Sequence, residues 1–169
     1  NHIRFGPGDA IEITPFEMDS DRKQTLKSHL MLFYLGRTRL ASDIAGEVIA
    51  NIGSRKSELR EIGSHVDSAI SILKGDGDLA DFGKLLDETW QLKRQLGQSI
   101  SNDTVDEIYS RARDHGAIGG KLLGAGGTGF MLLFVPPELQ SDVAAAMAPY
   151  MQASFDFEEQ GCQIVANEP

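Results

Sequence analysis

Hydrophobic residues along this chain follow two different periods in succession, and their order limits the folds that the chain can adopt. The first residues are β-like, because the runs 2–5 and 10–16 flank the turn cluster Gly6-Pro7-Gly8-Asp9. This pattern predicts a hairpin. Residues 29–35 (HLMLFYL) then form a continuous apolar run of strand length that stops at Gly36. Such a run is typical of a buried strand.

The middle of the chain changes to helical spacing. Apolar residues recur every three or four positions in the stretches 41–49, 55–74, 79–92 and 102–112, with charged residues on the opposite side. This spacing predicts a block of four amphipathic helices. The polar stretch 19–27, which precedes the first buried strand, predicts either a helix or a loop.

The last third of the chain returns to β-like patterns. Residues 117–123 and 129–135 are apolar runs joined by glycines, the Ala-rich stretch 138–150 predicts a helix, and residues 154–166 alternate around a turn. We therefore expect an α+β domain in which a helical block packs with an antiparallel sheet. The expected strands of this sheet are 29–35, 117–123, 129–135 and the hairpin 154–166.

The segment 119–129 (GGKLLGAGGTG) is unusually rich in glycine. Ordering glycine costs conformational entropy, so such a run needs a reason. One reason is close approach to a ligand, since a backbone without Cβ atoms can turn several N–H groups toward one phosphate, and Lys121 can add a positive charge. The other reason is tight packing of the sheet on a helix. The residues alone leave both explanations open.

Two familiar nucleotide motifs do not apply to this segment. Gly124, Gly126 and Gly129 reproduce G-x-G-x-x-G, but a dinucleotide-binding motif requires a helix directly afterwards, and residues 130–135 are β-like. An acidic residue is also missing at the expected distance of about 20 positions. A Walker loop is excluded because no Gly-Lys-Ser/Thr follows the glycines.

Charge and cysteine content exclude several classes of protein. The chain has 25 acidic and 16 basic residues and a net charge of -9, which argues against a nucleic-acid partner, because such binding needs clustered Lys and Arg. Cys162 is its single cysteine, so we expect no internal disulfide, no thiolate metal cluster and a reducing, cytoplasmic setting. No apolar run approaches the roughly 20 residues of a membrane helix, and we expect no metal site.

Three segments resemble one family of kinases. Residues 119–134 (GGKLLGAGGTGFMLLF) closely resemble the third motif of the GHMP kinases, the superfamily of galactokinase, homoserine kinase, mevalonate kinase and phosphomevalonate kinase. Residues 32–44 (LFYLGRTRLASDI) look like the segment that opens the C-terminal half of D-glycero-D-manno-heptose 7-phosphate kinases, and residues 155–164 (FDFEEQGCQI) resemble their closing hairpin. The resemblance covers essentially the whole chain, and fucose kinases share these features.

The resemblance implies that this chain is the C-terminal half of such a kinase, with a ferredoxin-like fold. Residues 1–28 would then remain from the upstream domain, and residues 29–169 would form the C-terminal domain. The implied reaction of the full-length protein is ATP-dependent phosphorylation of a heptose 7-phosphate at its anomeric hydroxyl, a step toward nucleotide-activated heptose. A fucokinase-like reaction is the alternative within the same class.

In this family ATP and Mg²⁺ are bound mainly by the N-terminal half, which contains a serine-rich phosphate loop and an acidic residue that acts on the attacking hydroxyl. Neither feature is found in these 169 residues. We therefore expect no catalytic residue in this chain and no turnover by the chain alone, because phosphoryl transfer depends on positioning and charge stabilisation by those parts.

The resemblance also implies where the ligands lie. The loop Gly124, Ala125, Gly126, Gly127, Thr128 and Gly129 would lie beside the phosphates of ATP, with Lys121 at the edge of the site. Arg37 and Arg39 are candidates for binding the 7-phosphate, because Arg offers bidentate donors; a solvated pair at a helix entrance is the alternative. Thr128 stands where the family commonly has glycine. Either this position is not left-handed, since a β-branched residue disfavours positive φ, or the loop differs locally; the hydroxyl can instead add a hydrogen bond.

The implied partners are a sugar phosphate and the N-terminal half of the same kinase. The resemblance allows a homo-oligomer and implies no membrane partner. A stand-alone, non-catalytic binding module of the same fold is the alternative from a different class. The upstream reading frame discriminates between them: a comparable length with the serine-rich loop favours the enzyme, and a start near Asn1 favours the module. Because the chain opens on a strand-like run without Met, we expect it to begin inside a larger protein.

Overall fold

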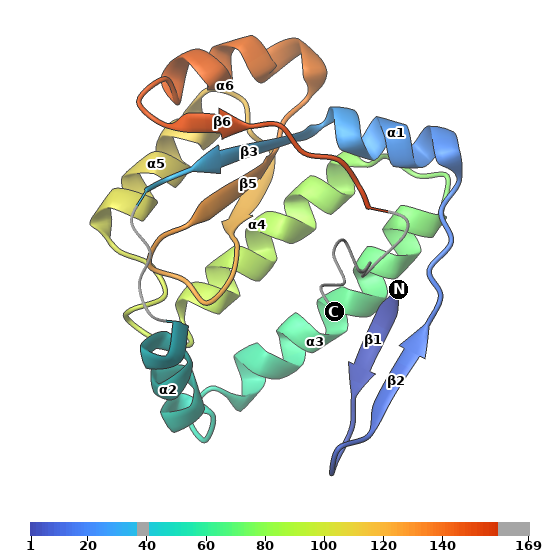
Figure 1. Ribbon diagram of the computed structural model, residues 1–169, viewed down its shortest axis with the longest axis vertical. Helices are drawn as coiled ribbons and strands as arrows, with labels where there is room; N and C mark the ends of the chain where they lie inside the picture. The colour runs from blue at the N-terminus through green and yellow to red at the C-terminus, as the bar shows by residue number, and fades with distance from the viewer. Residues whose placement is uncertain (37–40, 159–169) are drawn as a thin grey trace, which may run out of the picture.

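The computed structural model describes residues 1–36 and 41–158 and shows helices and strands in separate layers (Figure 1). Its strands are β1 (His2–Phe5), β2 (Ile11–Thr14), β3 (Leu30–Tyr34), β4 (Gly119–Leu122), β5 (Phe130–Phe134) and β6 (Met151–Ala153). Its helices are α1 (Ser20–Ser28), α2 (Ala41–Asn51), α3 (Lys56–Lys74), α4 (Ala80–Arg94), α5 (Asp103–Asp114) and α6 (Gln140–Ala146), with a 3₁₀ turn, η1 (Pro137–Leu139), before α6.

Within the described residues, four strands form one antiparallel sheet in the order β4-β5-β3-β6. β3 pairs with β5 from Leu30 opposite Phe134 to Tyr34 opposite Phe130, and β4 pairs with the other side of β5. The strands predicted within 29–35, 117–123 and 129–135 are confirmed, and so is the predicted α+β class.

The prediction of a hairpin at 154–166 is wrong in the part that the structure describes. The fourth strand is β6 (Met151–Ala153), which precedes the predicted hairpin and pairs with β3, with Ala153 opposite Leu32. Residues 159–166, the remainder of the predicted hairpin, lie outside the described residues.

The alternation that suggested a strand at 154–158 has a different cause. Phe155 and Phe157 are half-buried and their neighbours are exposed, but these residues are not in a strand. Asp156 instead forms an ion pair with Lys27 of α1, at 2.7 Å between Oδ2 and Nζ. The segment therefore packs beside α1, and its period of two reflects burial rather than sheet pairing.

The helical block agrees with its prediction. α2 to α5 occupy the four predicted stretches, and the stretch 19–27, left open between helix and loop, is helical from Ser20 onward in α1. This helix follows Asp19, whose carboxylate accepts two backbone N–H groups of the first turn. The helix predicted at 138–150 is shorter than expected, since α6 ends at Ala146. Pro149 explains this end, because the residue before a proline disfavours helical backbone.

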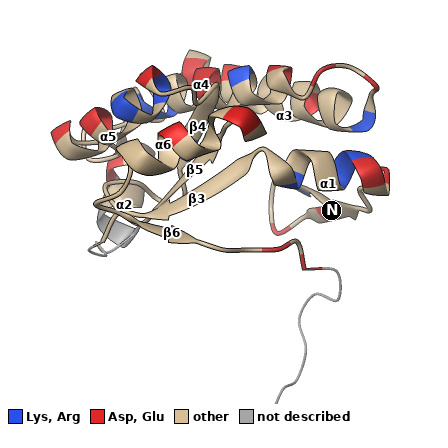
Figure 2. Cartoon of the chain, turned by 90° about the horizontal axis from the view of Figure 1, so that it is seen from above, with Lys and Arg blue, Asp and Glu red and all other residues tan. Residues whose placement is uncertain are grey.

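One face of the sheet packs against α5 and α6 to form the main core (Figures 1 and 2). Met31 and Phe33 of β3 lie on this face, in register with Leu133 and Met131 of β5, and all four are buried. Trp90 of α4 is also fully buried in this cluster. α5 adds Val105, Ile108 and Ala112, and α6 adds Val143, with Met147 directly after that helix.

The opposite face is filled at one end by a smaller cluster. There Phe134 packs with Leu26 of α1 and with Leu79, which directly precedes α4. Farther along the same face, Leu32 and Leu132 are only half-buried. In Figure 2 the acidic residues lie mainly on the helices and the strands carry few charges.

β1 and β2 form a separate two-stranded hairpin, as predicted. Ile3 lies opposite Ile13 and Phe5 opposite Ile11, and all four side chains are largely exposed. None of the helices in the described part of the chain is long and apolar enough to cross a membrane.

Candidate functional site

The loop of residues 124–129 joins β4 to β5 and depends on backbone conformations that favour glycine. Gly124, Gly126, Gly127 and Gly129 have φ angles of 76°, 132°, 75° and 118°. Left-handed backbone costs a residue with a Cβ atom about 1–2 kcal/mol. A Cβ on Gly124 would meet nothing within 4 Å, so conformation rather than space requires glycine at this position.

At Gly126 the space is restricted as well. A Cβ there would come within 2.7 Å of the carbonyl oxygen of Ile100. The same carbonyl accepts a hydrogen bond from the backbone N–H of Gly127 at 2.8 Å. The side-chain amide of Asn102 donates to the carbonyl oxygen of Gly127, also at 2.8 Å. The loop therefore rests on the segment between α4 and α5.

The packing explanation applies to the beginning of the glycine run. A Cβ on Gly119 would clash with the carbonyl oxygen of Gly83 on α4, and one on Gly120 would clash with the carbonyl oxygen of Leu132 on β5. These two glycines let β4 approach its neighbours closely. The packing explanation therefore holds at 119–120, and the approach of residues 124–129 to a ligand stays a prediction.

Thr128 takes the place of a glycine without adopting a left-handed backbone, since every positive φ in the described residues belongs to glycine. Its hydroxyl donates a hydrogen bond to the carbonyl oxygen of Gly36 at 2.7 Å. The N–H of Leu35 donates to the carbonyl oxygen of Gly129 at 2.8 Å. Thr128 therefore links the loop to the end of β3. Arg37 and Arg39 follow directly and lie outside the described residues, so their role stays a prediction.

Lys121 lies in β4, opposite Leu132 of β5, which lies opposite Leu32 of β3. Directly opposed residues of an antiparallel sheet share a face. Lys121 therefore belongs to the face opposite the main core. Its side chain is half-buried, and this burial lowers the pKa of its ammonium group. The structure thus places a partly desolvated cation just before the glycine loop.

A second lysine beside the loop was missed by the sequence prediction. Lys93, near the end of α4, donates from Nζ to the carbonyl oxygen of Gly124 at 2.6 Å. Burial, and to a smaller extent the charge of Lys121, lower its pKa to about 8. The sequence does contain one indication of this position. Leu79, Leu86 and Lys93 are seven positions apart, a spacing that puts residues on one side of a helix.

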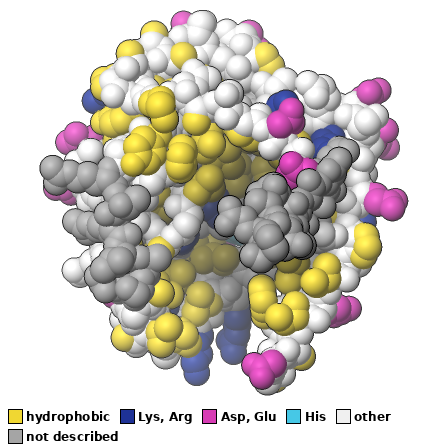
Figure 3. Space-filling view, in the orientation of Figure 1, with side chains coloured by type: hydrophobic (Ala, Val, Ile, Leu, Met, Phe, Trp, Pro, Cys, Tyr) yellow, Lys and Arg dark blue, Asp and Glu magenta, His cyan; other side chains and the backbone are white. Residues whose placement is uncertain are grey.

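The face that Figure 1 presents to the viewer is hollowed in its middle. The space-filling view in the same orientation shows hydrophobic side chains around this hollow and Lys or Arg atoms at its floor (Figure 3). A concave, mostly apolar surface with a few charged groups is typical of ligand sites.

A polar network holds β4 against two helices. The hydroxyl of Tyr109 on α5 donates to Oδ1 of Asp87 on α4 at 2.6 Å. Arg113 lies 3.7 Å from the other oxygen of Asp87 and donates to the carbonyl oxygens of Ala117 and Ile118 before β4. Burial, followed by the hydrogen bond to Asp87, raises the pKa of Tyr109. These contacts fix the strand that leads into the glycine loop.

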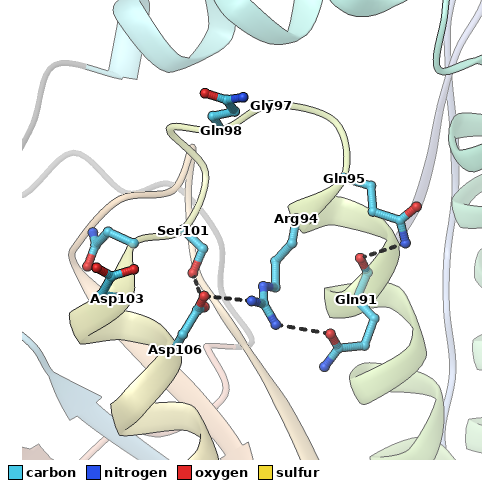
Figure 4. Close-up of a pocket in the computed structure, with 9 residues that line it drawn as sticks. Gln91, Arg94, Gln95, Gly97, Gln98, Ser101, Asp103 and Asp106 are labelled. Atoms are coloured by element: carbon cyan, nitrogen blue, oxygen red, sulfur yellow. Dashed lines mark hydrogen bonds and ion pairs between the residues drawn. The ribbon is translucent and has the colours of Figure 1, made fainter.

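The segment beneath the glycine loop borders a polar pocket (Figure 4). In this view Arg94 extends between Asp106 and Gln91, with its Nη2 2.6 Å from Oδ2 of Asp106. The hydroxyl of Ser101 donates to the other oxygen of Asp106 at 2.5 Å. Arg94 and Asp106 of the pocket thus pair with each other, and this pairing helps to fix the start of α5.

Glu47 of α2 holds the same segment from the other side. Its carboxylate accepts the backbone N–H groups of Gln98 at 2.7 Å and Ser99 at 3.0 Å, together with the Ser99 hydroxyl. These bonds, led by that of the hydroxyl, lower the pKa of Glu47. Ile100 follows directly and contacts Gly126, so α2 supports the glycine loop through this segment.

Comparison with known proteins shows which family this chain matches. Residues 68–152 match the family described as GHMP kinases C terminal. D-glycero-alpha-D-manno-heptose 7-phosphate kinase of Campylobacter jejuni is 30% identical over 167 residues, which are 95% of this chain and 48% of that protein. L-fucokinase/L-fucose-1-P guanylyltransferase of Bacteroides fragilis is 30% identical over 108 residues, 61% of this chain and 11% of that protein.

Among solved structures, mevalonate kinase of Methanococcus jannaschii has a TM-score of 0.65 at 23% identity, over 86% of this chain and 43% of that chain. This likeness shows a shared fold. The chain spans less than half the length of both the heptose kinase and the mevalonate kinase. The resemblance predicted from the glycine-rich segment is confirmed, and the chain belongs to the GHMP kinase family, whose C-terminal domain it contains.

Proposed function

We propose that this chain is the C-terminal part of an ATP-dependent sugar kinase that phosphorylates D-glycero-D-manno-heptose 7-phosphate at its anomeric hydroxyl. The observation that carries this proposal is a loop with four left-handed glycines next to two half-buried lysines, Lys93 and Lys121. Backbone in such loops binds phosphate well. The name of the Campylobacter jejuni relative supports the choice of sugar.

In this proposal each part of the chain binds a different group. Residues 124–129 lie beside the phosphates of ATP, Lys121 lies at the edge of the same site, and Arg37 and Arg39 bind the 7-phosphate of the sugar. Two partly desolvated cations suit a polyphosphate, because an anion favours their charged forms. ATP supplies the phosphoryl group, and the residues of this chain bind and orient its phosphates.

Mg²⁺ and the catalytic acidic residue belong to the upstream half in this proposal. Among the described residues, no group of three or more His, Cys, Asp or Glu is placed to hold a metal ion. The N-terminal half of the same protein is therefore the partner that completes the site, and the proposal allows for a homo-oligomer.

We assign residues 1–28 to the connection with the upstream domain and residues 29–169 to the C-terminal domain. The exposed apolar pairs of the β1–β2 hairpin support a connection to further protein, because such side chains gain stability when they are covered. A single cysteine, Cys162, supports placing the protein in the cytoplasm, since one cysteine cannot form a disulfide within the chain.

A substrate panel tests the proposed reaction in the full-length protein. We expect kcat/KM with ATP to be highest for heptose 7-phosphate and lower for unphosphorylated heptose and L-fucose, with ³¹P NMR showing the new phosphate on the anomeric carbon. A preference for L-fucose would favour the fucokinase-like alternative, which the Bacteroides fragilis relative supports. No turnover with any sugar would favour the non-catalytic binding module.

A further inference from the structure

Two ammonium groups, those of Lys93 and Lys121, lie close enough for the charge on one to affect the proton affinity of the other. The ion pairs in the described part of the chain include neither residue. Both side chains are half-buried, and a desolvated charge without an opposite charge is unfavourable. An anion between the two lysines would supply an opposite charge to both ammonium groups.

The positions of Lys121 in β4 and of Lys93 in α4 place both lysines on one side of the sheet. Lys121 shares a row with Leu132 and Leu32, on the face opposite the main core. On α4, Lys93 continues the stripe of Leu79 and Leu86, which pack in the cluster on that same face. Both lysines thus belong to the side of the sheet opposite the main core.

Lys93 also connects the pair to the glycine loop. Its bond to the carbonyl oxygen of Gly124 uses one of the three hydrogens of the ammonium group. Two hydrogens of Lys93 therefore remain for another acceptor. The left-handed backbone of Gly124, with φ of 76°, lies in open space on its Cβ side. A phosphate can accordingly approach Lys93 without a side chain at residue 124 in its way.

We propose that Lys93 and Lys121 together bind a phosphate group, and that Lys93 holds this phosphate and the carbonyl oxygen of Gly124 at the same time. Lys93 is thereby a phosphate-binding residue supplied by α4, outside the glycine-rich segment. The inference rests on the proposed function only for the source of the phosphate, which is either the nucleotide or the sugar phosphate. The anion site itself does not require that the kinase reaction occurs.

The test is an NMR titration of lysine side-chain signals with inorganic pyrophosphate at constant ionic strength, on this chain and on the full-length protein. We expect the signals of Lys93 and Lys121 to shift together with one dissociation constant. Lys93→Met and Lys121→Met should each weaken binding by about tenfold or more, as expected for a lost hydrogen bond to a charged group. Circular dichroism of each variant checks that the fold is intact.

The matched control is Lys84→Met on the same helix. Lys84 is exposed and pairs with Asp81 at 2.8 Å, so its loss should leave pyrophosphate binding unchanged. Unmoved Lys93 and Lys121 signals would overturn the proposal, and so would wild-type affinity in Lys93→Met. ADP and heptose 7-phosphate are titrated separately, and the one that shifts both signals at the lower concentration is the source of the phosphate.

The outcome of this titration is independent of the proposed reaction. A missing lysine response counts against the lysine site, whatever sugar the full-length protein phosphorylates. Conversely, intact pyrophosphate binding at Lys93 and Lys121 with no sugar phosphorylation counts against the proposed function alone.

Discussion

The ammonium nitrogen of Lys93 lies 2.6 Å from the carbonyl oxygen of Gly124, although the two residues are 31 positions apart in the sequence. The contact joins α4 to the glycine loop on the side of the sheet that faces away from the main core. Burial and the charge of Lys121 lower the pKa of the same lysine to about 8. A measurement of this pKa therefore reports on the environment of the loop.

Removing the charge of Lys121 should raise the pKa of Lys93. Burial is the larger cause of the lowered value and repulsion from Lys121 the smaller one. In Lys121→Met the repulsion disappears and the burial remains, so the pKa should move upward from about 8 and stay below its ordinary value of 10.5. NMR titration of the Lys93 side chain measures this, and an unchanged value would show that the two ammonium groups do not interact.

Stability should rise with pH above about 8 because of Lys93. The folded protein releases this proton near pH 8, whereas the unfolded chain keeps it up to about 10.5. The unfolded state therefore binds more protons in this window, and the free energy of unfolding increases with pH. Lys121 acts in the same direction, since burial lowers its pKa as well.

Urea unfolding between pH 7 and pH 9.5 measures this dependence. The range stays below the ordinary pKa of Tyr109, 10.0, because burial raises the pKa of that phenol and reverses the sign at higher pH. Lys93→Met should show a smaller rise than the wild type. An equal rise in both proteins would assign the effect to other groups.

Alanine should be tolerated better at Gly124 than at Gly126. Both positions have a positive φ, which costs alanine about 1–2 kcal/mol. At Gly126 the added Cβ would also meet the carbonyl oxygen of Ile100 at 2.7 Å, whereas the space at Gly124 is open. The free energy of unfolding in urea should therefore fall further for Gly126→Ala than for Gly124→Ala.

The control for this pair is Gly63→Ala in the interior of α3. A Cβ there meets nothing within 4 Å, and alanine in a helix is more favourable than glycine by roughly 0.5–1 kcal/mol. This variant should gain stability. Equal losses at Gly124 and Gly126 would mean that the close approach to Ile100 does not constrain the loop.

Arg37→Ala and Arg39→Ala in the full-length protein should raise KM for heptose 7-phosphate by about tenfold each, the size expected for a lost charged hydrogen bond. KM for unphosphorylated heptose should not change, because that sugar has no 7-phosphate. Arg60→Ala, at an exposed position of α3, is the matched control. An unchanged KM in both arginine variants would remove them from the site.

Most of the fold could be predicted from the sequence, because the period of the apolar residues changes where the elements change. Val105 and Ile108 show the buried side of their helix through spacing alone, and the continuous apolar run 29–35 indicates a buried strand. The fourth strand could not be placed in this way. Phe155 and Phe157 alternate as strand residues do, but their burial comes from packing beside α1, which depends on the tertiary structure.

The candidate site was only partly predictable for a similar reason. The glycines at 124–129 are visible as a local run, and their left-handed backbone agrees with the expectation of a specialised loop. Lys93 looks like an ordinary lysine at the end of a helix. Its distinguishing interactions are a hydrogen bond to Gly124 and charge repulsion from Lys121. Both join residues about thirty positions apart and arise only when α4 packs along β4.

The decisive experiment compares ATP-dependent phosphorylation of D-glycero-D-manno-heptose 7-phosphate by the full-length protein and by the 169-residue chain alone. We expect the full-length protein to form a product with phosphate on its anomeric carbon. The chain alone should form none, because the proposed function assigns the phosphate loop and the acidic residue to the upstream half. Turnover by the chain alone, or none by the full-length protein, would contradict this division of the kinase.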